Sequence, residues 1–530
     1  MPRLGSRLFA PAIALAAGLL ALLLSWATGG LSPSLINPDE GGHYVNALFL
    51  GDWLRAGLPS PLAYAKHYYA HFPRLTIGHW PPGWYMLEAP LFAIVRPSPA
   101  HAVAMSAFIA GLPAIVPVWA FARLGRSRLG LALAGGYLLL PTVVEAGRFI
   151  LLDQPTALIV GAAAIAWARA SEVPSWPRLL LFAALAAFAP LVKGNGACVA
   201  LVPAIDIALT GRWDLLRRPA LWVSGALALL VVAPWYWLSF AISASGFNYA
   251  PGPAYALLAL RFNLAAFWAE VGPGEVALTL VGAAVAFRGA PGEKRLARLA
   301  LAVLLAVLLF QSLVPVALEP RYLSPLLPWA TVLIGLALLT CWRRARLLTP
   351  ALAGAALAWP AAALAKLPPK PDLVASVLVA AMARAGGVWL VDARAGGEGA
   401  VIAQGAWADG ERHRLWIARA SQWLSTSDFM GRGYVLTATT PAAARAVLDR
   451  LGAAGAVSIA ERDRLAYPHS RVLRAAMAAG GYALARRPFP TGAGETLLAS
   501  RAAPVSPNAA LLAAGLGSAD AGKMDAKLGR

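Results

Sequence analysis

The feature that most constrains this chain is a series of long apolar segments joined by short loops. Of its 530 residues, 59% are hydrophobic and only 13% are charged, and the mean hydropathy is +0.63. Soluble domains carry about 25% charged residues, which this chain does not approach. An apolar run of about 20 residues is long enough to cross a bilayer as a helix. The sequence therefore predicts a polytopic α-helical membrane protein.

We predict about eleven transmembrane helices, counted from apolar runs of sufficient length. The run Trp84–Val95 is too short to cross and is flanked by prolines, so we expect a juxtamembrane helix there. The predicted spans lie near residues 8–28, 101–121, 129–146, 155–170, 178–192, 196–210, 219–240, 274–288, 298–315, 322–341 and 348–366.

The net charge of +20 comes largely from arginines clustered in the short loops. Basic residues are retained on the cytoplasmic side of membrane proteins, so this pattern predicts topology and argues against a nucleic-acid partner. Arg3 and Arg7 then place the N-terminus in the cytoplasm, with an uncleaved first helix. Residues 29–100, 147–154, 193–195, 241–273, 316–321 and those after 366 are expected on the outer face.

The composition changes after Pro368, where short strand-like and helix-like runs alternate. We predict a small soluble α/β domain over residues 367–503, following a membrane domain over 1–366, and a disordered tail over 504–530. The predicted strands lie near 387–393, 414–418, 434–438, 457–459 and 482–485, and the predicted helices near 441–451 and 471–479. Cys198 and Cys341 support neither a disulfide framework nor a zinc motif.

Two adjacent carboxylates, Asp39 and Glu40, follow the first apolar segment. Acidic residues at a membrane boundary are costly unless they work or face water, so Asp39 is a candidate general base with Glu40 beside it. The alternative is structural, because Asn37-Pro38-Asp39-Glu40 also has the pattern of a helix start. The two interpretations are compatible.

Charged residues elsewhere on the predicted outer face are few. Asp153 stands before an apolar helix and is either functional or a helix N-cap, and Arg148 could pair with it. Lys193 interrupts two apolar segments within Lys193-Gly194-Asn195-Gly196, either to hold a phosphate or as a snorkelling lysine. Arg321 could bind phosphate or form a salt bridge to Glu319.

The first predicted outer loop, which includes residues 29–100, is rich in histidines and aromatic residues. Tryptophan and tyrosine suit both a membrane interface and sugar stacking, so this signal is weak. His43, His67, His71 and His79 could join Asp39 around a divalent metal, but no spacing matches a known ligand pattern. We therefore predict no cofactor with certainty, and a divalent metal stays an alternative that no ligand spacing supports.

In this order, these motifs resemble the GT-C superfamily of membrane glycosyltransferases, and within it glycosyltransferase family 39, which includes protein O-mannosyltransferases and the lipid A aminoarabinose transferases. The resemblance covers about residues 8–366. Its motifs are Asp39-Glu40, the segment Pro81-Pro82-Gly83-Trp84-Tyr85, Arg148 with Asp153 and Pro155, Lys193-Gly194, and the run from Arg321 to Pro328.

The resemblance implies an inverting transfer of a sugar from a polyprenyl-phosphate donor to a lipid, glycan or protein acceptor. It implies Asp39 as base, Asp153 as second carboxylate, and Lys193, Arg321 and Arg148 around the donor phosphate. His43, His79, Tyr85 and Tyr322 are expected near the substrate. Relatives often carry lysine before the double proline, where this chain has Trp80 preceded by His79, so the contact of that lysine with the donor is either lost or supplied by His79.

The implied location is the inner (plasma) membrane of a bacterium, with the C-terminal domain in the periplasm. A transporter or flippase for a lipid-linked sugar is the main alternative, although transporters often show repeat symmetry that is not evident in this chain. A membrane-anchored binding protein acting through residues 370–503 is a third interpretation.

Overall fold

The computed structural model describes residues 9–514 except 374, 429–430, 462–466, 491–493 and 503–504. The chain divides into two compact units. We call the first, comprising the described part of Met1–Gly30 with Gly78–Trp84 and Ala104–Pro368, the helical unit. The second, comprising Leu31–Ile77, Tyr85–Val103 and the described part of Pro369–Arg530, is called the sheet unit.

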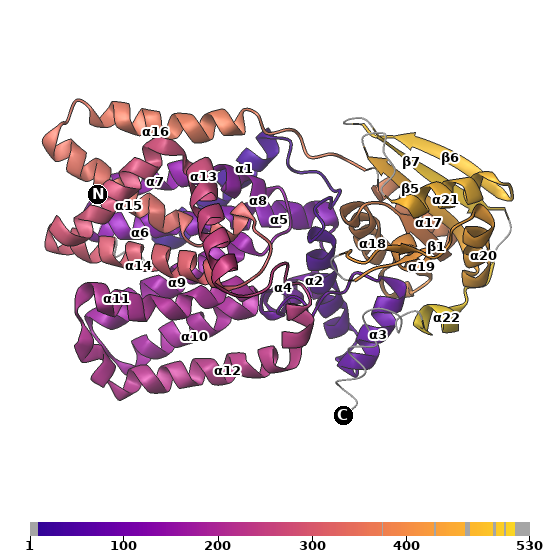
Figure 1. Ribbon diagram of the computed structural model, residues 1–530, viewed down its shortest axis with the longest axis horizontal. Coiled ribbons are helices and arrows are strands. Elements are labelled where there is room, and N and C mark those ends of the chain that lie inside the picture. Colours follow the sequence, from indigo (N-terminus) through magenta and orange to yellow (C-terminus); the bar gives the residue numbers. More distant parts are fainter. Residues whose placement is uncertain are drawn as a thin grey trace. The chain divides into compact units, whose positions relative to one another are not determined.

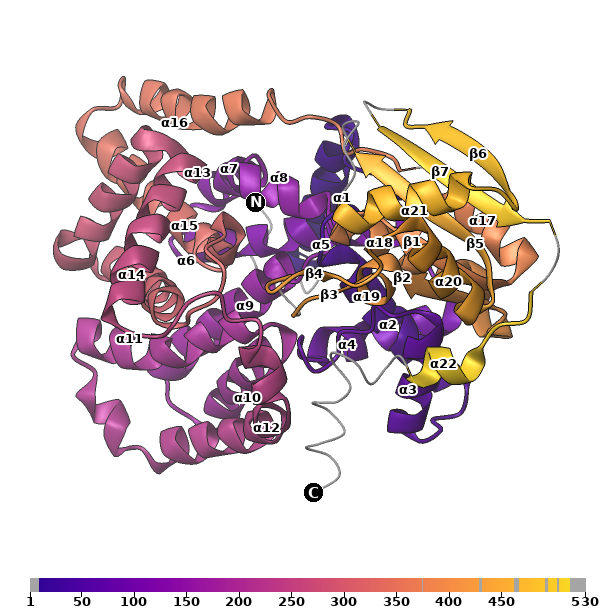
Figure 2. The same ribbon diagram turned by 45° about the vertical axis from the view of Figure 1, so that its right-hand side comes forward.

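The helical unit contains a helix, or consecutive helices, at each predicted span. Figures 1 and 2 show α10 and α12 side by side within this unit. Its helices are α1 (Phe9–Ala27), the second part of α5 (Pro99–Gly111), α6 (Ile115–Arg123), α7 (Ser127–Leu138), α8 (Pro141–Gly147), α9 (Asp153–Glu172), α10 (Trp176–Val192), α11 (Val202–Thr210), α12 (Pro219–Ala244), α13 (Pro253–Arg288), α14 (Pro291–Leu313), α15 (Leu327–Arg344) and α16 (Thr349–Leu364).

Several of these helices are broken or bent, which affects the number of membrane crossings. Within the described residues, five helices are long and apolar enough to span a bilayer, or six if the bent pair α7–α8 is one span. The predicted number of eleven stays a prediction. Helix α13 begins at Pro253 and consists of two helical parts that meet at a kink at Gly272. The predicted span near 274–288 corresponds to the second part, which follows the non-helical Gly272 (φ 79°) and Pro273, and the sequence did not indicate the first part.

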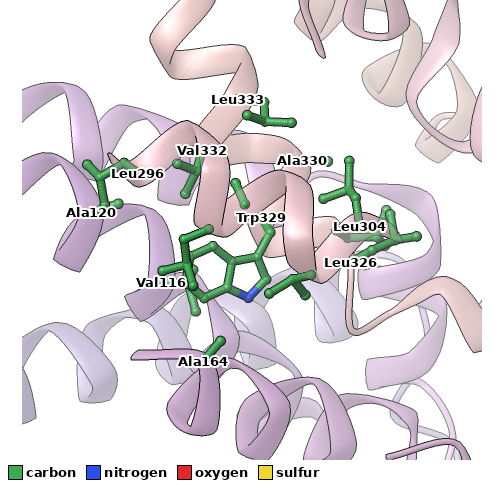
Figure 3. Close-up of a cluster of buried hydrophobic side chains, with 14 of the residues drawn as sticks. Val116, Ala120, Ala164, Leu296, Leu304, Leu326, Trp329, Ala330, Val332 and Leu333 are labelled. Carbon is green, nitrogen blue, oxygen red and sulfur yellow. The ribbon is translucent and has the colours of Figure 1, made fainter. Parts of the chain in front are cut away.

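The core of the helical unit surrounds α15, whose residues from Leu327 to Leu339 are all buried. A helix that is apolar on every face has to be enclosed by other helices, and α15 packs against α6, α7, α13 and α14. Figure 3 shows Trp329 at the centre of this packing, with Val116, Ala164 and Leu326 among its surroundings. Helix α15 begins at Leu327, within the Arg321–Pro328 motif, and holds the end of that motif in the core.

The sheet unit combines the first long segment after α1 with the C-terminal part of the chain. Its helices are α2 (Glu40–Arg55), α3 (Pro61–His71), most of α4 (Gly83–Ile94), α17 (Ala375–Ala385), α18 (Ala395–Asp409), α19 (Ala420–Trp423), α20 (Pro441–Leu451), α21 (Pro468–Ala478) and α22 (Ala509–Ala514). Its strands are β1 (Gly387–Asp392), β2 (Leu415–Arg419), β3 (Ser425–Thr426), β4 (Val435–Leu436), β5 (Ala453–Glu461), β6 (Tyr482–Pro488) and β7 (Gly494–Arg501).

Five strands form one sheet in the order β2-β1-β5-β7-β6. Strands β2, β1 and β5 are parallel to one another, whereas β7 and β6 are antiparallel to their neighbours. Strand β2 stands first in this order and is therefore an edge strand. Val388 and Leu390 of β1 pack with α20 and α21, while Leu415 and Ile417 of β2 contact α18 near Gly405. Helices therefore cover both faces of the parallel part, as a buried parallel sheet requires (Figure 1).

Most elements predicted after Pro368 are present, including the predicted helix start at Pro441. Thr440 caps α20 by accepting a hydrogen bond from the backbone N–H of Ala443 at 3.1 Å. The predicted strand near 434–438 is reduced to β4, and the sequence did not indicate α17, α18 or β7. Helix α22 lies in the segment predicted as a disordered tail, and residues 515–530 fall outside the described residues.

Helices α2 and α18 cross at very short distance through glycines. A Cβ atom built on Gly41 would lie 2.7 Å from the Cα of Gly399, and one built on Gly396 would lie 1.8 Å from the carbonyl oxygen of Ile36. Real Cβ atoms do not approach so closely, so only glycine fits at both positions. The glycines after Asp39-Glu40 and those of α18 thus hold the acidic motif against the C-terminal part of the sheet unit.

We expect Gly396→Ala to destabilise the sheet unit, because the Ile36 backbone would have to move to admit the new methyl group. The expected loss is about 1–3 kcal/mol, measured as a lower unfolding midpoint in detergent. Gly135→Ala on α7 is the control, because a Cβ there meets nothing within 4 Å. Equal stability of the two variants would contradict the close crossing.

Candidate active site

Asp39 occupies the N-cap position of α2, as the helix-start pattern predicts. Its side chain makes no capping hydrogen bond and is half-buried, while its backbone N–H donates to Oδ1 of Asn37 at 3.0 Å. The Asp39 carboxylate therefore does not cap the helix. The Asp39 side chain remains partly accessible at the N-terminal end of α2.

Glu40, the adjacent acid, is fully buried and ion-paired. Its Oε1 lies 2.8 Å from Nζ of Lys370, and neither side chain is exposed. Its Oε2 accepts a hydrogen bond from the backbone N–H of Asn37 at 2.9 Å. Both carboxylate oxygens of Glu40 thus fix the start of α2, and the two neighbouring acids have different surroundings.

His43 and Tyr85 lie together in the same unit. Nδ1 of His43 is 2.6 Å from the Tyr85 hydroxyl, and both side chains are buried. Burial raises the pKa of Tyr85 well above its usual value, so the phenol stays neutral. The pair lies one helical turn after Asp39 and orients the first turn of α2 against α4.

Arg74 is a cation beside the acidic motif that sequence reasoning did not identify. Its guanidinium donates to the carbonyl of Pro38. Burial, with Arg419 nearby, lowers the pKa of Arg74 to about 10, so the group is charged at neutral pH. Arg74 thus contributes positive charge next to Asp39.

A second group of predicted residues meets in the helical unit around Asp153. Asp153 is the first residue of α9 rather than its N-cap, and its side chain has no exposed surface. Nζ of Lys193 lies 2.6 Å from Oδ1 of Asp153. Lys193 is itself only 6% exposed and sits in extended backbone between α10 and a 3-10 helix at Gly194–Leu201. The snorkelling alternative for Lys193 is therefore not observed.

Arg321 also faces Asp153, with Nη1 3.8 Å from Oδ2. Its Nε donates to Glu319, so the salt bridge weighed from sequence is present. Two carboxylates and two cations thus form one group, which we call the Asp153 cluster: Asp153, Lys193, Glu319 and Arg321. Its formal charges balance, which offsets the cost of burying Asp153 and Lys193, while the Glu319 side chain is 39% exposed.

Aromatic rings cover the two cations of this cluster. Nζ of Lys193 lies 4.6 Å from the ring centre of Tyr322 and 5.8 Å from that of Trp80. Arg321 lies 5.5 Å from the ring centre of Tyr322. Trp80, which stands where relatives often carry lysine, therefore contacts Lys193. His79 packs edge-on against Trp80 with ring centres 5.2 Å apart.

Arg148 is placed differently from its predicted pairing. It is buried, its Nη2 donates to the carbonyl of Pro368, and its Cγ fills the space above Gly30. A Cβ on Gly30 would lie 2.3 Å from that Cγ atom. These contacts give Arg148 a role in packing, and its predicted role at a donor phosphate stays a proposal.

The predicted site residues thus fall into two groups, each within one unit. The sheet unit contains Asp39, Glu40, His43 and Tyr85. The helical unit contains His79, Arg148, Asp153, Lys193, Arg321 and Tyr322. Sequence reasoning missed Lys370 and Arg74. Lys370 carried a signal, because a lysine between prolines on the predicted outer side departs from the usual placement of basic residues.

Comparisons with known proteins show what the chain is similar to. Residues 80–237, which contain Trp80, Asp153 and Lys193, match the model of a family described as dolichyl-phosphate-mannose-protein mannosyltransferase. No curated protein is matched by the chain in sequence.

Two solved structures are among those with similar architecture. The oligosaccharyltransferase of Archaeoglobus fulgidus, solved with zinc and sulfate, is 14% identical, covers 90% of this chain and 72% of its own, and has a TM-score of 0.53. ArnT from Cupriavidus metallidurans, solved with undecaprenyl phosphate, is 17% identical with coverage of 84% and 81% and a TM-score of 0.45. Over residues 80–237 the chain is thus similar in sequence to this mannosyltransferase family, and its fold is similar to that of the oligosaccharyltransferase.

Proposed function

We propose that the protein transfers a sugar from a polyprenyl-phosphate donor to an acceptor at the outer face of a bacterial inner membrane, with inversion at the anomeric carbon. The observation that carries this proposal is the Asp153 cluster. Two of its four residues, Asp153 and Lys193, lie in the segment that matches a family named for a lipid-phosphate mannose donor, and the cluster presents a lysine and an arginine beside aromatic rings. Cations neutralise a departing phosphate and aromatic faces suit a sugar.

The chemistry assigns a different task to each group of residues. Asp39 accepts the proton of the acceptor nucleophile, whose oxygen or nitrogen forms the new bond to the anomeric carbon. The bond from that carbon to the phosphate oxygen breaks, and polyprenyl phosphate leaves with the electron pair. Lys193 and Arg321 stabilise the charge that develops on this oxygen. Asp153 holds the Lys193 ammonium in place through their 2.6 Å contact.

The two acids of the first motif therefore have separate roles. Asp39 is half-buried and its carboxylate makes no capping bond, which suits a base. Glu40 is held by Lys370 and the Asn37 backbone, which suits a positioning residue. We therefore assign Glu40 to holding the start of α2 and not to a chemical step.

A transfer assay tests the proposal. The full-length protein in detergent is incubated with a panel of radiolabelled polyprenyl-phosphate sugars and a bacterial envelope extract as acceptor. We expect release of free polyprenyl phosphate together with label on the acceptor. Movement of intact donor across the bilayer of proteoliposomes, without release of polyprenyl phosphate from any donor, would instead support a flippase.

Arg321→Gln should lower the rate constant of transfer by about 100- to 1,000-fold, because one group that stabilises the leaving phosphate is lost. Arg212→Gln is the matched control, since Arg212 also bridges an acid two residues away but is exposed. The kcat values of both variants are compared with wild type at saturating donor. An unchanged kcat for Arg321→Gln would remove Arg321 from the proposed mechanism.

Lys193 needs a paired design, because Lys193→Met alone leaves the buried Asp153 carboxylate without its 2.6 Å partner. We expect that single variant to be both unstable and inactive. The double variant Lys193→Met/Asp153→Asn removes both charges, so it should recover stability while staying inactive. Recovery of activity in the double variant would show that Lys193 is only structural.

A further inference from the structure

Three histidines that are distant in sequence come together in the sheet unit. His67 and His71 lie one turn apart on α3, and His413 lies two residues before the start of β2 at Leu415. One ligand nitrogen from each lies within 4.8 Å of the other two. The ring centres are 4.8 Å apart for His67 with either partner and 5.2 Å apart for His71 with His413.

His71 is oriented as a metal ligand is. Its Nδ1 lies 2.9 Å from the carbonyl oxygen of Leu415, which can only accept a hydrogen bond, so Nδ1 carries the proton and Nε2 carries the lone pair. Nε2 of His71 is buried and has no hydrogen-bond partner. A backbone carbonyl on the second ring nitrogen is the usual support of a metal-bound histidine. The His71 ring packs against the Trp416 ring, with the ring centres 3.6 Å apart.

His413 adopts φ of 47°, a left-handed conformation that a residue with a Cβ takes rarely. Such backbone strain is kept where surrounding structure imposes it, as at ligand sites.

We propose that His67, His71 and His413 bind one transition-metal ion of the Zn²⁺ type, with water in the fourth position. Zinc–nitrogen bonds of about 2.0–2.1 Å in a tetrahedron place ligand nitrogens about 3.4 Å apart. The three histidine nitrogens would therefore have to approach one another by little more than about 1 Å. Three imidazoles suit zinc, copper, cobalt or nickel, whereas magnesium and calcium prefer oxygen ligands. His67 is exposed and provides access from solvent.

The position of the site suggests a structural role. Strand β2 is an edge of the sheet, and α3 packs against it. The hydrogen bond from His71 to Leu415 already joins residues 344 positions apart, and the metal would add a second link between the same two elements. This metal would fix the segment that begins with Asp39 to the C-terminal part of the sheet unit. The proposal does not depend on the transfer reaction.

The test uses full-length protein in detergent, purified through a tag without histidine and stripped with a chelator. Zn²⁺ is titrated against a chromophoric chelator. We expect one Zn²⁺ per chain in the wild type, unaffected by excess Mg²⁺. His67→Ala should weaken binding by at least about 100-fold, since one of three protein ligands is lost. His67 is exposed, so this variant is expected to fold.

His101→Ala is the matched control, because His101 is exposed and its Nδ1 is hydrogen-bonded to the Ser98 hydroxyl. It should bind Zn²⁺ as the wild type does. A second readout is amide hydrogen exchange: Zn²⁺ should slow exchange in α3 and β2 of the wild type and not of His67→Ala. Equal Zn²⁺ affinity in His67→Ala and wild type, or binding without added protection of these segments, would overturn the proposal.

Discussion

Asp39→Asn should reduce sugar transfer by about 100- to 10,000-fold while leaving the protein folded. A positioned general base contributes this much to rate, and asparagine cannot accept the acceptor proton at neutral pH. The fold should tolerate the change because the Asp39 side chain makes no capping hydrogen bond and asparagine is equally suited to an N-cap position. Transfer is measured as release of labelled polyprenyl phosphate, and folding as a monodisperse elution profile with an unchanged unfolding midpoint.

Two further variants separate a base from a general electrostatic effect. Asp214→Asn removes an exposed acid that pairs with Arg212 and should leave the rate unchanged. Asp39→Ala should be inactive yet regain part of its activity with added formate, because a small carboxylate can enter the space beside half-buried Asp39 and accept the proton. A wild-type rate of transfer in Asp39→Asn would contradict the assignment of Asp39 as the general base.

Lys370→Met should destabilise the sheet unit by about 3–5 kcal/mol, because it leaves the Glu40 carboxylate buried without a counter-charge. The start of α2 should loosen with it, since Glu40 also holds the backbone of Asn37. We therefore expect both a lower unfolding midpoint in detergent and slower transfer. Lys366→Met, at an exposed lysine four residues earlier, should change neither quantity.

The double variant Glu40→Gln/Lys370→Met identifies the cause. Removing both charges abolishes the uncompensated carboxylate, and the Gln amide oxygen can still accept from the Asn37 backbone. The double variant should thus be more stable than Lys370→Met alone, which a double-mutant cycle reports as a coupling between the two positions. Additive destabilisation would show that the pair is not coupled in the way its 2.8 Å contact indicates.

The helical unit was largely predictable because lipid imposes one rule on any crossing segment. Its backbone groups have to be satisfied internally, so an apolar run of sufficient length becomes a helix. That rule located α1 and α12 to within four residues, and α14 and α15 with starts displaced by seven and five residues. It placed a span from about residue 274, just after the kink at Gly272, but did not predict the part of α13 before the kink, which only the tertiary structure shows to be helical.

Residue types alone singled out Asp39, Asp153, Lys193 and Arg321, since charges at the ends of apolar segments are costly unless they function. The tertiary structure decided which of these charges meet. It paired Asp153 with Lys193, 40 positions apart, and Glu40 with Lys370, 330 positions apart. Hydropathy is a local property and carries no information about such partners. The gathering of His67 and His71 with His413 was hidden for the same reason, because it depends on how α3 lies against the edge of the sheet.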